Sequence, residues 1–340
     1  MTRPGGCRAG VGAMTTPGGR RDGAGAVTRP GGWRDGAGAS LGGRPRWMNP
    51  AYGFVMPALL AIAVFFFVPA LASVLLSLTD FDIYAIASRA NLRLTWHENY
   101  ARLLGDPLFW LALRNTLYFV VVAGPLSIAA SLAAALLVSA RLVRWKGLFR
   151  TVLFLPVVTT LVAVGVVWRY AYHPRIGLLN HALGALGVGP VDWLGDPAWA
   201  MPALILMAVW KGFGFNMVIF IAGLQNVPER LYEAASIDGA GTVAQLRHVT
   251  LPLLAPTFLF VAVMTAIGYF QLFAEPYVMT QGGPAHATLS IVLLMYGEGF
   301  RWWNMGYAAA IAFVLFALIL ALTLVTLRLR ARGPSRELAT

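Results

Sequence analysis

Six long apolar runs limit what this chain can fold into. About 20 helical residues cover the roughly 30 Å of hydrocarbon in a bilayer, because each residue of an α-helix rises about 1.5 Å. Each run reaches this length, and they lie at about 53–78, 113–139, 148–171, 200–223, 254–275 and 305–327. We therefore expect an all-α membrane protein with six transmembrane helices and with lipid around it.

The composition agrees with this expectation. Hydrophobic residues make up 58% of the 340 residues and charged residues 12%, whereas about 25% of the residues of a soluble domain are charged. No core of ordinary size could bury so much apolar surface. A soluble protein is therefore excluded.

The positive charge follows membrane topology. Half of the net charge of +12 lies in residues 1–50, which hold eight Arg and two Asp, and much of the rest lies in 141–150, 224–252 and the C-terminus. Excess Lys and Arg mark the cytoplasmic side, so both termini and the loop 224–252 are expected inside. Because the charge is divided in this way, we do not expect nucleic acid as a partner.

The two ends of the chain differ from its centre. Residues 1–50 are rich in Gly, Pro and Arg and partly repeat, as TTPGGRRDGAGA and TRPGGWRDGAGA, a composition typical of disorder. We expect a disordered cytoplasmic tail at 1–50, a six-span domain at 51–330 and a short cytoplasmic tail at 331–340. Translation from Met48 is an open alternative to a start at Met1.

The loop 224–252 carries strong local signals of folded structure. Asn226 and Glu229, with Pro228 between them, predict a helix start. The pair Asp238-Gly239 predicts a turn. Thr242 and Gln245 have the spacing of a capping box for a second short helix, which Pro252 would end. We expect two short helices joined by a glycine turn at the inner membrane face.

This loop resembles the EAA motif of the membrane subunits of bacterial ABC importers. The matching residues are Glu233, Ala234, Ala235, Gly239, Val249, Leu251 and Pro252. The fuller form YEAASIDGA is similar to the carbohydrate-type permeases, as are NYARLLGDPLFWLALRNTLYF (99–119), GLLN (177–180), VMTQGGPAHAT (278–288) and MGYAAA (305–310). The resemblance covers about residues 50–330.

The resemblance implies a coupling helix between the fourth and fifth spans, docked on a cytoplasmic ATPase. It assigns the ATPase coupling to Glu233, Ala234, Ala235, Asp238, Gly239, Leu251 and Pro252. It also implies a second homologous permease, an extracytoplasmic solute-binding protein, a sugar or related polyol as cargo, and the bacterial inner membrane as location.

No cofactor is expected in this chain. Its two lysines, Lys146 and Lys211, do not lie in a G-x-x-x-x-G-K-[ST] sequence, so ATP would be used by the partner. A single cysteine, Cys7, and five scattered histidines give no spacing that suits a metal.

Polar and aromatic residues in the fourth and fifth spans are candidates for the substrate path. A lysine at mid-bilayer costs about 2.5–3.5 kcal/mol on insertion scales, so Lys211 is expected to face a cavity or a partner. The other candidates are Phe215, Asn216, Thr265, Tyr269 and Gln271. Snorkelling, interfacial aromatic belts and hydrogen bonds between spans are alternative explanations for these residues.

Two other functional classes remain alternatives. An ion-coupled secondary transporter would need ionisable residues inside its spans, and beyond Lys211 the spans hold almost none, with Glu275 at an outer end. A membrane enzyme would need a cluster of His, Asp or Glu, which the sequence does not group. We therefore expect no enzymatic activity, and copurification of an ATPase would discriminate among the three.

Overall fold

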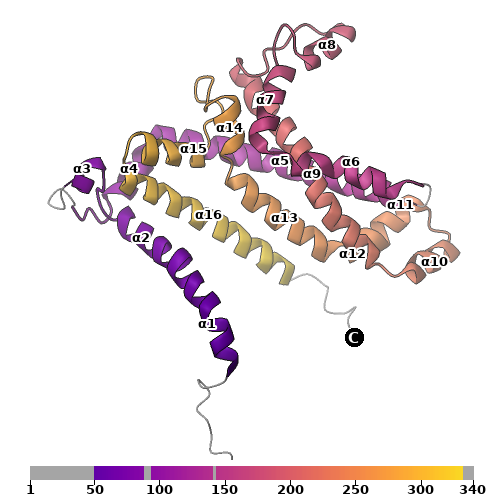
Figure 1. The fold of residues 1–340 in the computed structure, drawn as a ribbon. Coiled ribbons are helices and arrows are strands. Elements are labelled where there is room, and N and C mark those ends of the chain that lie inside the picture. The colour runs from indigo at the N-terminus through magenta and orange to yellow at the C-terminus, as the bar shows by residue number, and fades with distance from the viewer. Residues whose placement is uncertain (1–49, 88–92, 141–142, 332–340) are drawn as a thin grey trace, which may run out of the picture. The chain divides into compact units, whose positions relative to one another are not determined.

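The computed structural model describes residues 50–87, 93–140 and 143–331. The chain separates into two compact units, Met1–Leu60 and Ala61–Thr340. The described residues form helices (Figure 1), and among them an isolated bridge between Thr79 and Leu94 is the one trace of β-structure. The predicted tails 1–50 and 331–340 lie outside the described residues, except for Pro50 and Ala331, which belong to the first and last helices.

The helices follow one another along the chain, with three five-residue π-helical turns labelled η. They are α1 (Pro50–Ile62), η2 (Ala63–Phe67), α2 (Val68–Ser77), α3 (Ile83–Ala87), α4 (Glu98–Gly105), α5 (Pro107–Ser139), α6 (Lys146–Val158), α7 (Leu161–Ala171), α8 (Leu178–Ala185), α9 (Pro197–Gln225), α10 (Glu229–Ile237), α11 (Thr242–Gln245), η4 (Leu246–Thr250), α12 (Leu251–Leu253), α13 (Ala255–Phe270), α14 (Ala274–Met279), α15 (Ile291–Tyr296), η5 (Gly297–Arg301) and α16 (Met305–Ala331).

Four described helices are long and apolar enough to cross a membrane. They are Gly53–Ser77, Pro107–Ser139, Pro197–Gln225 and Met305–Arg328. Two bent pairs, Lys146–Val158 with Leu161–Ala171 and Thr242–Leu253 with Ala255–Phe270, bring the number to six if each pair is one span. All six expected spans therefore have a helical counterpart, but two of them are not straight.

The predicted third span, 148–171, is broken. Helices α6 and α7 meet at 96°, because Thr159 and Thr160 adopt extended backbone between them. The Thr159 hydroxyl donates to the carbonyl of Pro156 at 2.6 Å. A side chain thus satisfies a carbonyl that the interrupted helix leaves open.

The predicted fifth span, 254–275, ends early. Its helix α13 stops at Phe270, and a new short helix, α14, begins at Ala274. Pro276 has no amide to donate to the carbonyl of Leu272, four residues earlier. The hydroxyl of Ser290 donates to this carbonyl at 2.6 Å instead.

Two of the spans begin earlier than predicted. Helix α5 starts at Pro107 rather than 113, and α9 starts at Pro197 rather than 200. In both, an aspartate precedes the proline and caps the helix: Asp106 accepts from the amide of Leu108, and Asp196 from that of Ala198, each at 2.8 Å.

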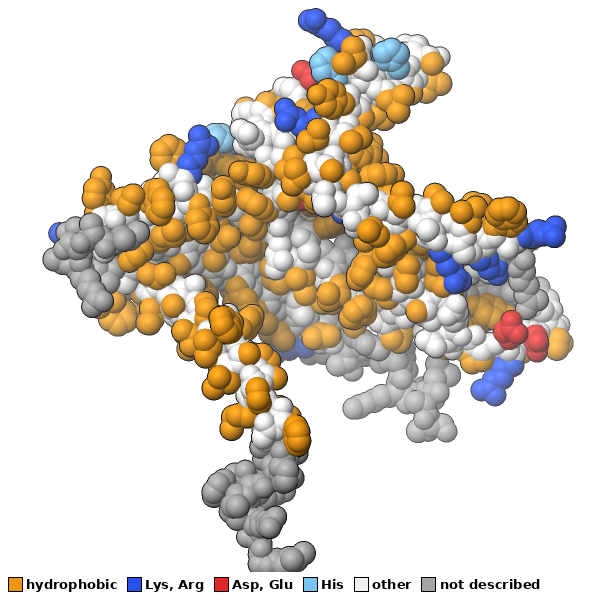
Figure 2. Space-filling model, viewed as in Figure 1, with side chains coloured by type: hydrophobic (Ala, Val, Ile, Leu, Met, Phe, Trp, Pro, Cys, Tyr) orange, Lys and Arg blue, Asp and Glu red, His pale blue; other side chains and the backbone are white. Residues whose placement is uncertain are grey.

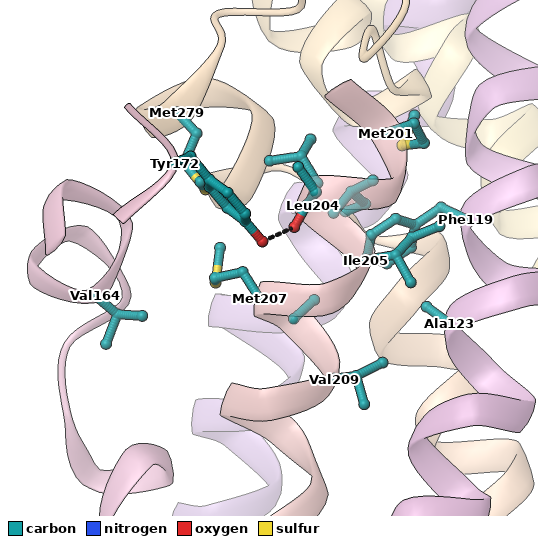
Figure 3. Close-up of a cluster of buried hydrophobic side chains, with 13 residues drawn as sticks. Phe119, Ala123, Val164, Tyr172, Met201, Leu204, Ile205, Met207, Val209 and Met279 are labelled. Carbon is teal, nitrogen blue, oxygen red and sulfur yellow. Dashed lines mark hydrogen bonds between the residues drawn. The ribbon is translucent and has the colours of Figure 1, made fainter. Parts of the chain in front are cut away.

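Helix α5 lies along α9 and α13 and forms the centre of the second unit. Thirteen buried side chains from α5, α7, α9 and α14 and their flanking loops form one apolar cluster (Figure 3). Within it, the Tyr172 hydroxyl donates to the carbonyl of Ala203 at 2.7 Å, as the dashed line marks. Burial raises the pKa of Tyr172, so this hydroxyl stays protonated as a donor.

The outer surface is apolar as well. Figure 2 shows hydrophobic side chains over most of the described surface in this view. Large side chains such as Phe65, Leu71 and Val121 are more than half exposed. A soluble monomer rarely leaves patches of this extent in water, whereas acyl chains would cover them.

Glycine allows the closest contact between α6 and α9. A Cβ added at Gly214 would clash with the carbonyl oxygen of Leu153 and would lie 3.1 Å from the Cα of Phe154. Because both contacts are with backbone, no side chain could turn away. Small residues let two helices approach in this way inside membranes.

We predict that Gly214→Ala separates α6 from α9 and destabilises the protein by about 1–3 kcal/mol, the usual cost of overpacking. Thermal unfolding of the detergent-solubilised protein measures this loss. Gly124→Ala is the matched control, since a Cβ there meets nothing within 4 Å. A helical glycine replaced by alanine without a clash gains about 0.5–1 kcal/mol, so equal midpoints for the two variants would contradict the prediction.

Candidate functional site

The polar loop between α9 and α13 folds as expected into short helices joined by a glycine turn. We call residues 228–253 the coupling segment; it contains α10, α11, η4 and α12. Gly239 has φ +78°, and the amide of Ala240 donates to the carbonyl of Ala235 at 2.8 Å. Glycine is needed here for its left-handed conformation rather than for space, because a Cβ would meet nothing within 4 Å.

The predicted helix boundaries in this segment are partly wrong. Asn226 ends α9 instead of starting α10, whose N-cap is Pro228. Gly241, not Thr242, is the N-cap of α11. Pro252 does not stop the helix, since it stands in the first turn of α12, where a missing amide costs nothing.

Gln245 and Tyr232 join the two halves of the coupling segment. The Gln245 amide donates to the Ser236 hydroxyl and to the Ala240 carbonyl, both at 3.0 Å. The Tyr232 hydroxyl lies 2.9 Å from the Thr250 hydroxyl. Gln245 therefore joins α10 to α11, and Tyr232 joins α10 to η4. The predicted capping box would have made neither contact.

The predicted coupling residues lie on the surface. Glu233, Ala234, Asp238 and Gly239 are exposed and Ala235 is half-buried, while Leu251 and Pro252 are exposed where the segment leads into α13. Figure 2 shows Asp and Glu side chains together over α10, with basic side chains nearby. The residues are thus placed where a partner could reach them.

Two apolar residues complete this surface, and the sequence analysis did not identify them. Ile237 is 86% exposed and Val243 is 78% exposed, on either side of the glycine turn. The signal was present, because these are the β-branched aliphatic residues that flank the turn in SIDGAGTV. Apolar side chains held in the open at the tip of a polar segment are typical of an interaction surface.

The structure brings some of the predicted path residues together. Asn216 of α9 donates to the Thr265 hydroxyl of α13 at 2.9 Å, and both side chains are buried. The Tyr269 ring packs edge-on against Phe119 at 5.2 Å between centroids. These three residues therefore lie between α5, α9 and α13.

The other three path residues do not join them. Phe215 is 50% exposed, and Gln271 is exposed just beyond the end of α13. Lys211 is half-buried at the middle of α9.

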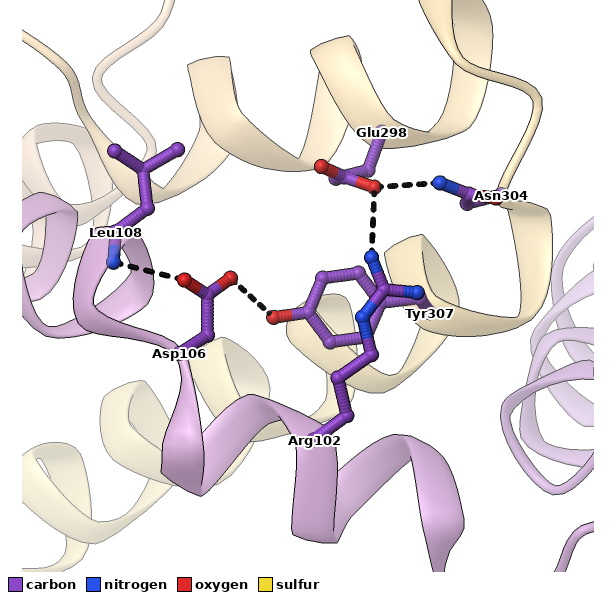
Figure 4. Close-up of polar contacts among 6 residues, drawn as sticks. All are labelled: Arg102, Asp106, Leu108, Glu298, Asn304 and Tyr307. Atoms are coloured by element: carbon purple, nitrogen blue, oxygen red, sulfur yellow. Dashed lines mark hydrogen bonds and ion pairs between the residues drawn. The ribbon is translucent and has the colours of Figure 1, made fainter.

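A polar network joins the start of α5 to the start of α16 (Figure 4). The Tyr307 hydroxyl donates to Asp106 at 2.8 Å, and the Arg102 guanidinium stacks 4.1 Å above the Tyr307 ring. Arg102 also lies 3.8 Å from the carboxylate of Glu298, which accepts from Asn304 at 2.8 Å. The two sequence segments 99–119 and 305–310 are therefore in contact.

Asparagine side chains hold two further loops. Asn115 of α5 donates to the carbonyls of His286 and Leu289 at 2.9 and 3.1 Å. Asn180 donates to the carbonyls of Pro174 and Val191 and accepts from the Trp193 indole. The segments that resembled a family by sequence are thus anchoring points of the loops, and no described residues group as a metal site.

The sequence matches a known family over most of its length. The family model described as binding-protein-dependent transport system inner membrane component covers residues 128–332. The lactose transport system permease protein LacF of Rhizobium radiobacter is 37% identical over 79% of this chain and 90% of its own length. The arabinooligosaccharides transport system permease protein AraP of Bacillus subtilis is 34% identical over 82% and 87%.

A third relative is also a transport permease, and a solved structure has the same fold. The trehalose/maltose transport system permease protein MalF of Thermococcus litoralis is 34% identical over 82% of this chain and 92% of its own. The crystal structure of a bacterial ABC transporter that imports alginate has the same fold, with a TM-score of 0.71 at 20% identity over 84% of this chain and 96% of that chain.

The exposed segment between α9 and α13 contains the motif on which the resemblance was based. It lies entirely within the residues that match the family model. The chain therefore belongs to the family of inner membrane components of binding-protein-dependent transport systems, the permease subunits of ABC importers, and it is a transport protein rather than an enzyme.

Proposed function

We propose that this permease and a second, homologous permease form the translocation pathway for a sugar or related polyol, driven by separate cytoplasmic ATPase subunits. The observation that carries the proposal is the coupling segment, a folded surface that offers Glu233, Asp238 and two apolar side chains to a partner. The carbohydrates named for the relatives (lactose, arabinooligosaccharides, trehalose and maltose) support the substrate class.

The proposed topology has six spans with both termini in the cytoplasm. It counts the bent pair Lys146–Val158 and Leu161–Ala171 as one span and Ala255–Phe270 of the second pair as another, so that these two and the four continuous helices cross the bilayer, with Thr242–Leu253 at the cytoplasmic face. The coupling segment then faces inward and the network of Figure 4 outward. A solute-binding protein would dock on the outward loops, as the alginate transporter was crystallised with a periplasmic protein.

The permease itself performs no chemistry in this scheme. ATP binding closes the ATPase pair, and the coupling segments move with it. The spans change from inward-open to outward-open, accept the cargo from the binding protein and release it inside after hydrolysis. Lys211, Phe215, Asn216, Thr265, Tyr269 and Gln271 remain the proposed path residues, and Asn216 and Thr265 are hydrogen-bonded to each other.

The orientation can be tested with a single cysteine. We predict that Ile237→Cys, in a background in which Cys7 is replaced by Ser, reacts with a membrane-impermeant maleimide in inverted vesicles and not in intact cells. The side chain at this position is 86% exposed, so in vesicles prepared without the ATPase subunit its labelling depends on sidedness. Tyr170→Cys, 68% exposed near the outer end of α7, is the control with the opposite pattern. Labelling of Ile237→Cys from outside would overturn the topology.

The coupling role predicts that Glu233→Ala and Gly239→Asp each reduce ATP-dependent uptake at least about tenfold, because truncating one partner of a charged interface contact costs about 2–5 kcal/mol. The aspartate also strains a backbone that favours glycine. Uptake into proteoliposomes and copurification of the ATPase measure the effect.

Two matched controls lie away from the coupling segment. Glu98→Ala removes an exposed carboxylate in the first turn of α4. Gly187→Asp replaces another glycine with φ +77° and open space around it. Losses of the same size in the controls would show that fold stability, and not docking, explains the result.

The path residues predict a change in selectivity. We expect Lys211→Gln, Phe215→Ala and Tyr269→Phe to change the ratio of uptake rates for two competing sugars by about two- to tenfold, the effect of one contact or hydrogen bond. Phe316→Ala, on α16 and 58% exposed, is the control for Phe215. Competition between labelled sugars in whole cells gives the ratio, and unchanged ratios in all three variants would remove these residues from the path.

A further inference from the structure

The coupling segment has almost no apolar core. Helices α10, α11 and α12 contain no buried residue, and Thr250 of η4, 4% exposed, is the buried member of the segment. Helices of nine and four residues are marginal on their own in water. Hydrogen bonds between side chains must therefore hold the shape of this segment.

The chain connects α10 unequally to its two neighbouring spans. Residues 226–228 lead directly from α10 back to α9. In the other direction, α10 reaches α13 only through the turn that contains Gly239 and Gly241, and a Cβ added at either glycine would meet nothing within 4 Å. Hydrogen bonds to and from Ala240 hold this turn, but no side chain packs around its two glycines, so it can bend when α10 is pushed. By the main chain alone, a push on α10 would reach α9 much more directly than α13.

The Tyr232–Thr250 hydrogen bond bypasses this turn. Tyr232 immediately precedes Glu233, and its hydroxyl lies 2.9 Å from that of Thr250. Thr250 stands one turn before the bend at Leu254, whose amide donates to the Thr250 carbonyl at 2.9 Å. Half-buried, Tyr232 points into the segment rather than toward a partner.

Gln245 makes a second link across the turn, from α11 to α10. Its amide bonds Ser236 of α10, and the Ser236 hydroxyl donates back to the carbonyl of Tyr232 at 2.7 Å. The links from Tyr232 and Gln245 therefore converge on the middle of α10, where the predicted coupling residues lie.

Above the segment, α9 and α13 are braced against each other. A Cβ at Gly223 would lie 2.7 Å from the Thr257 hydroxyl and 2.8 Å from the Leu254 side chain. Higher in the spans, the buried Asn216–Thr265 hydrogen bond joins the two helices again. Motion that reaches Thr250 would thus be delivered to α13 where it packs against α9.

We propose that Tyr232, together with Thr250 and Gln245, is a positioning group that transmits movement of the coupling segment to α13. It acts through other residues and contacts neither the cargo nor the ATP. The inference rests on the proposed function, because it assumes that an ATPase pushes on α10.

The test reconstitutes the complete transporter and measures cargo uptake per ATP hydrolysed. Tyr232→Phe and Thr250→Val each remove one hydroxyl, and we expect each to lower this ratio about two- to tenfold, which corresponds to the loss of one hydrogen bond. The double variant should be no worse than the worse single variant, because both remove the same bond. Thr250→Ser, which keeps the hydroxyl, should restore the ratio.

Tyr170→Phe is the matched control, since it removes an exposed phenol that forms no hydrogen bond among the described residues. A ratio equal to wild type in Tyr232→Phe would overturn the proposal. So would additive losses in the double variant, or a fall in hydrolysis and uptake in equal proportion, which indicates lost protein. If the wild-type assembly itself shows no ATP-driven uptake, the proposed function fails instead.

Discussion

The fold depends on one constraint, the need to satisfy every backbone carbonyl and amide where no water is available. Inside a bilayer an open backbone group costs several kcal/mol, so irregular backbone survives only where another group of the protein takes the missing hydrogen bond. Two breaks in the described helices follow this rule. The Ser290 hydroxyl donates to the Leu272 carbonyl, to which Pro276 has no amide hydrogen to donate. The Thr159 hydroxyl donates to the Pro156 carbonyl. Asn115 binds two carbonyls of the loop before α15. The polar side chains buried in this apolar chain are mainly there to support its irregular parts.

This constraint explains why the sequence predicted the spans well but their shapes poorly. Apolar runs identify helices by length alone, and all six runs have a helical counterpart. The early starts of α5 and α9 were also readable, since Asp106-Pro107 and Asp196-Pro197 are strong helix-start signals. The bends were not readable. Pro156 and Pro276 mark where a helix can break, but Pro57, Pro125 and Pro202 stand inside α1, α5 and α9 without ending them. The group that takes over an open carbonyl can be distant in the sequence, as Ser290 is from Leu272.

The coupling segment and the path residues differ in the same way in how far the sequence predicted them. In the coupling segment, the Gly239 turn and the pair of short helices follow from local sequence, because their determinants lie within a few residues of each other. The misplaced capping box shows the limit of this reasoning: Gly241 is the N-cap, and Gln245 donates its side-chain amide to Ser236, nine residues earlier in the chain. In the spans, Asn216 and Thr265 were identified as polar, but their pairing joins residues 49 positions apart. Tyr307 and Asp106 lie 201 positions apart. No local pattern predicts such pairs.

Why the coupling segment is polar inside and apolar at its tip follows from where it stands. Ile237 and Val243 are exposed, and a segment that presents them to a partner, as we propose, cannot also bury them for its own stability. Hydrogen bonds are directional, so a few of them can fix one geometry without a core, although each adds only about 0.5–1.5 kcal/mol. Exchanging Tyr232 and Thr250 for apolar residues could preserve the helices and still lose their relative orientation. Orientation is what the proposed lever between an ATPase and α13 needs, and under that proposal the polar contacts matter more than their modest energies suggest.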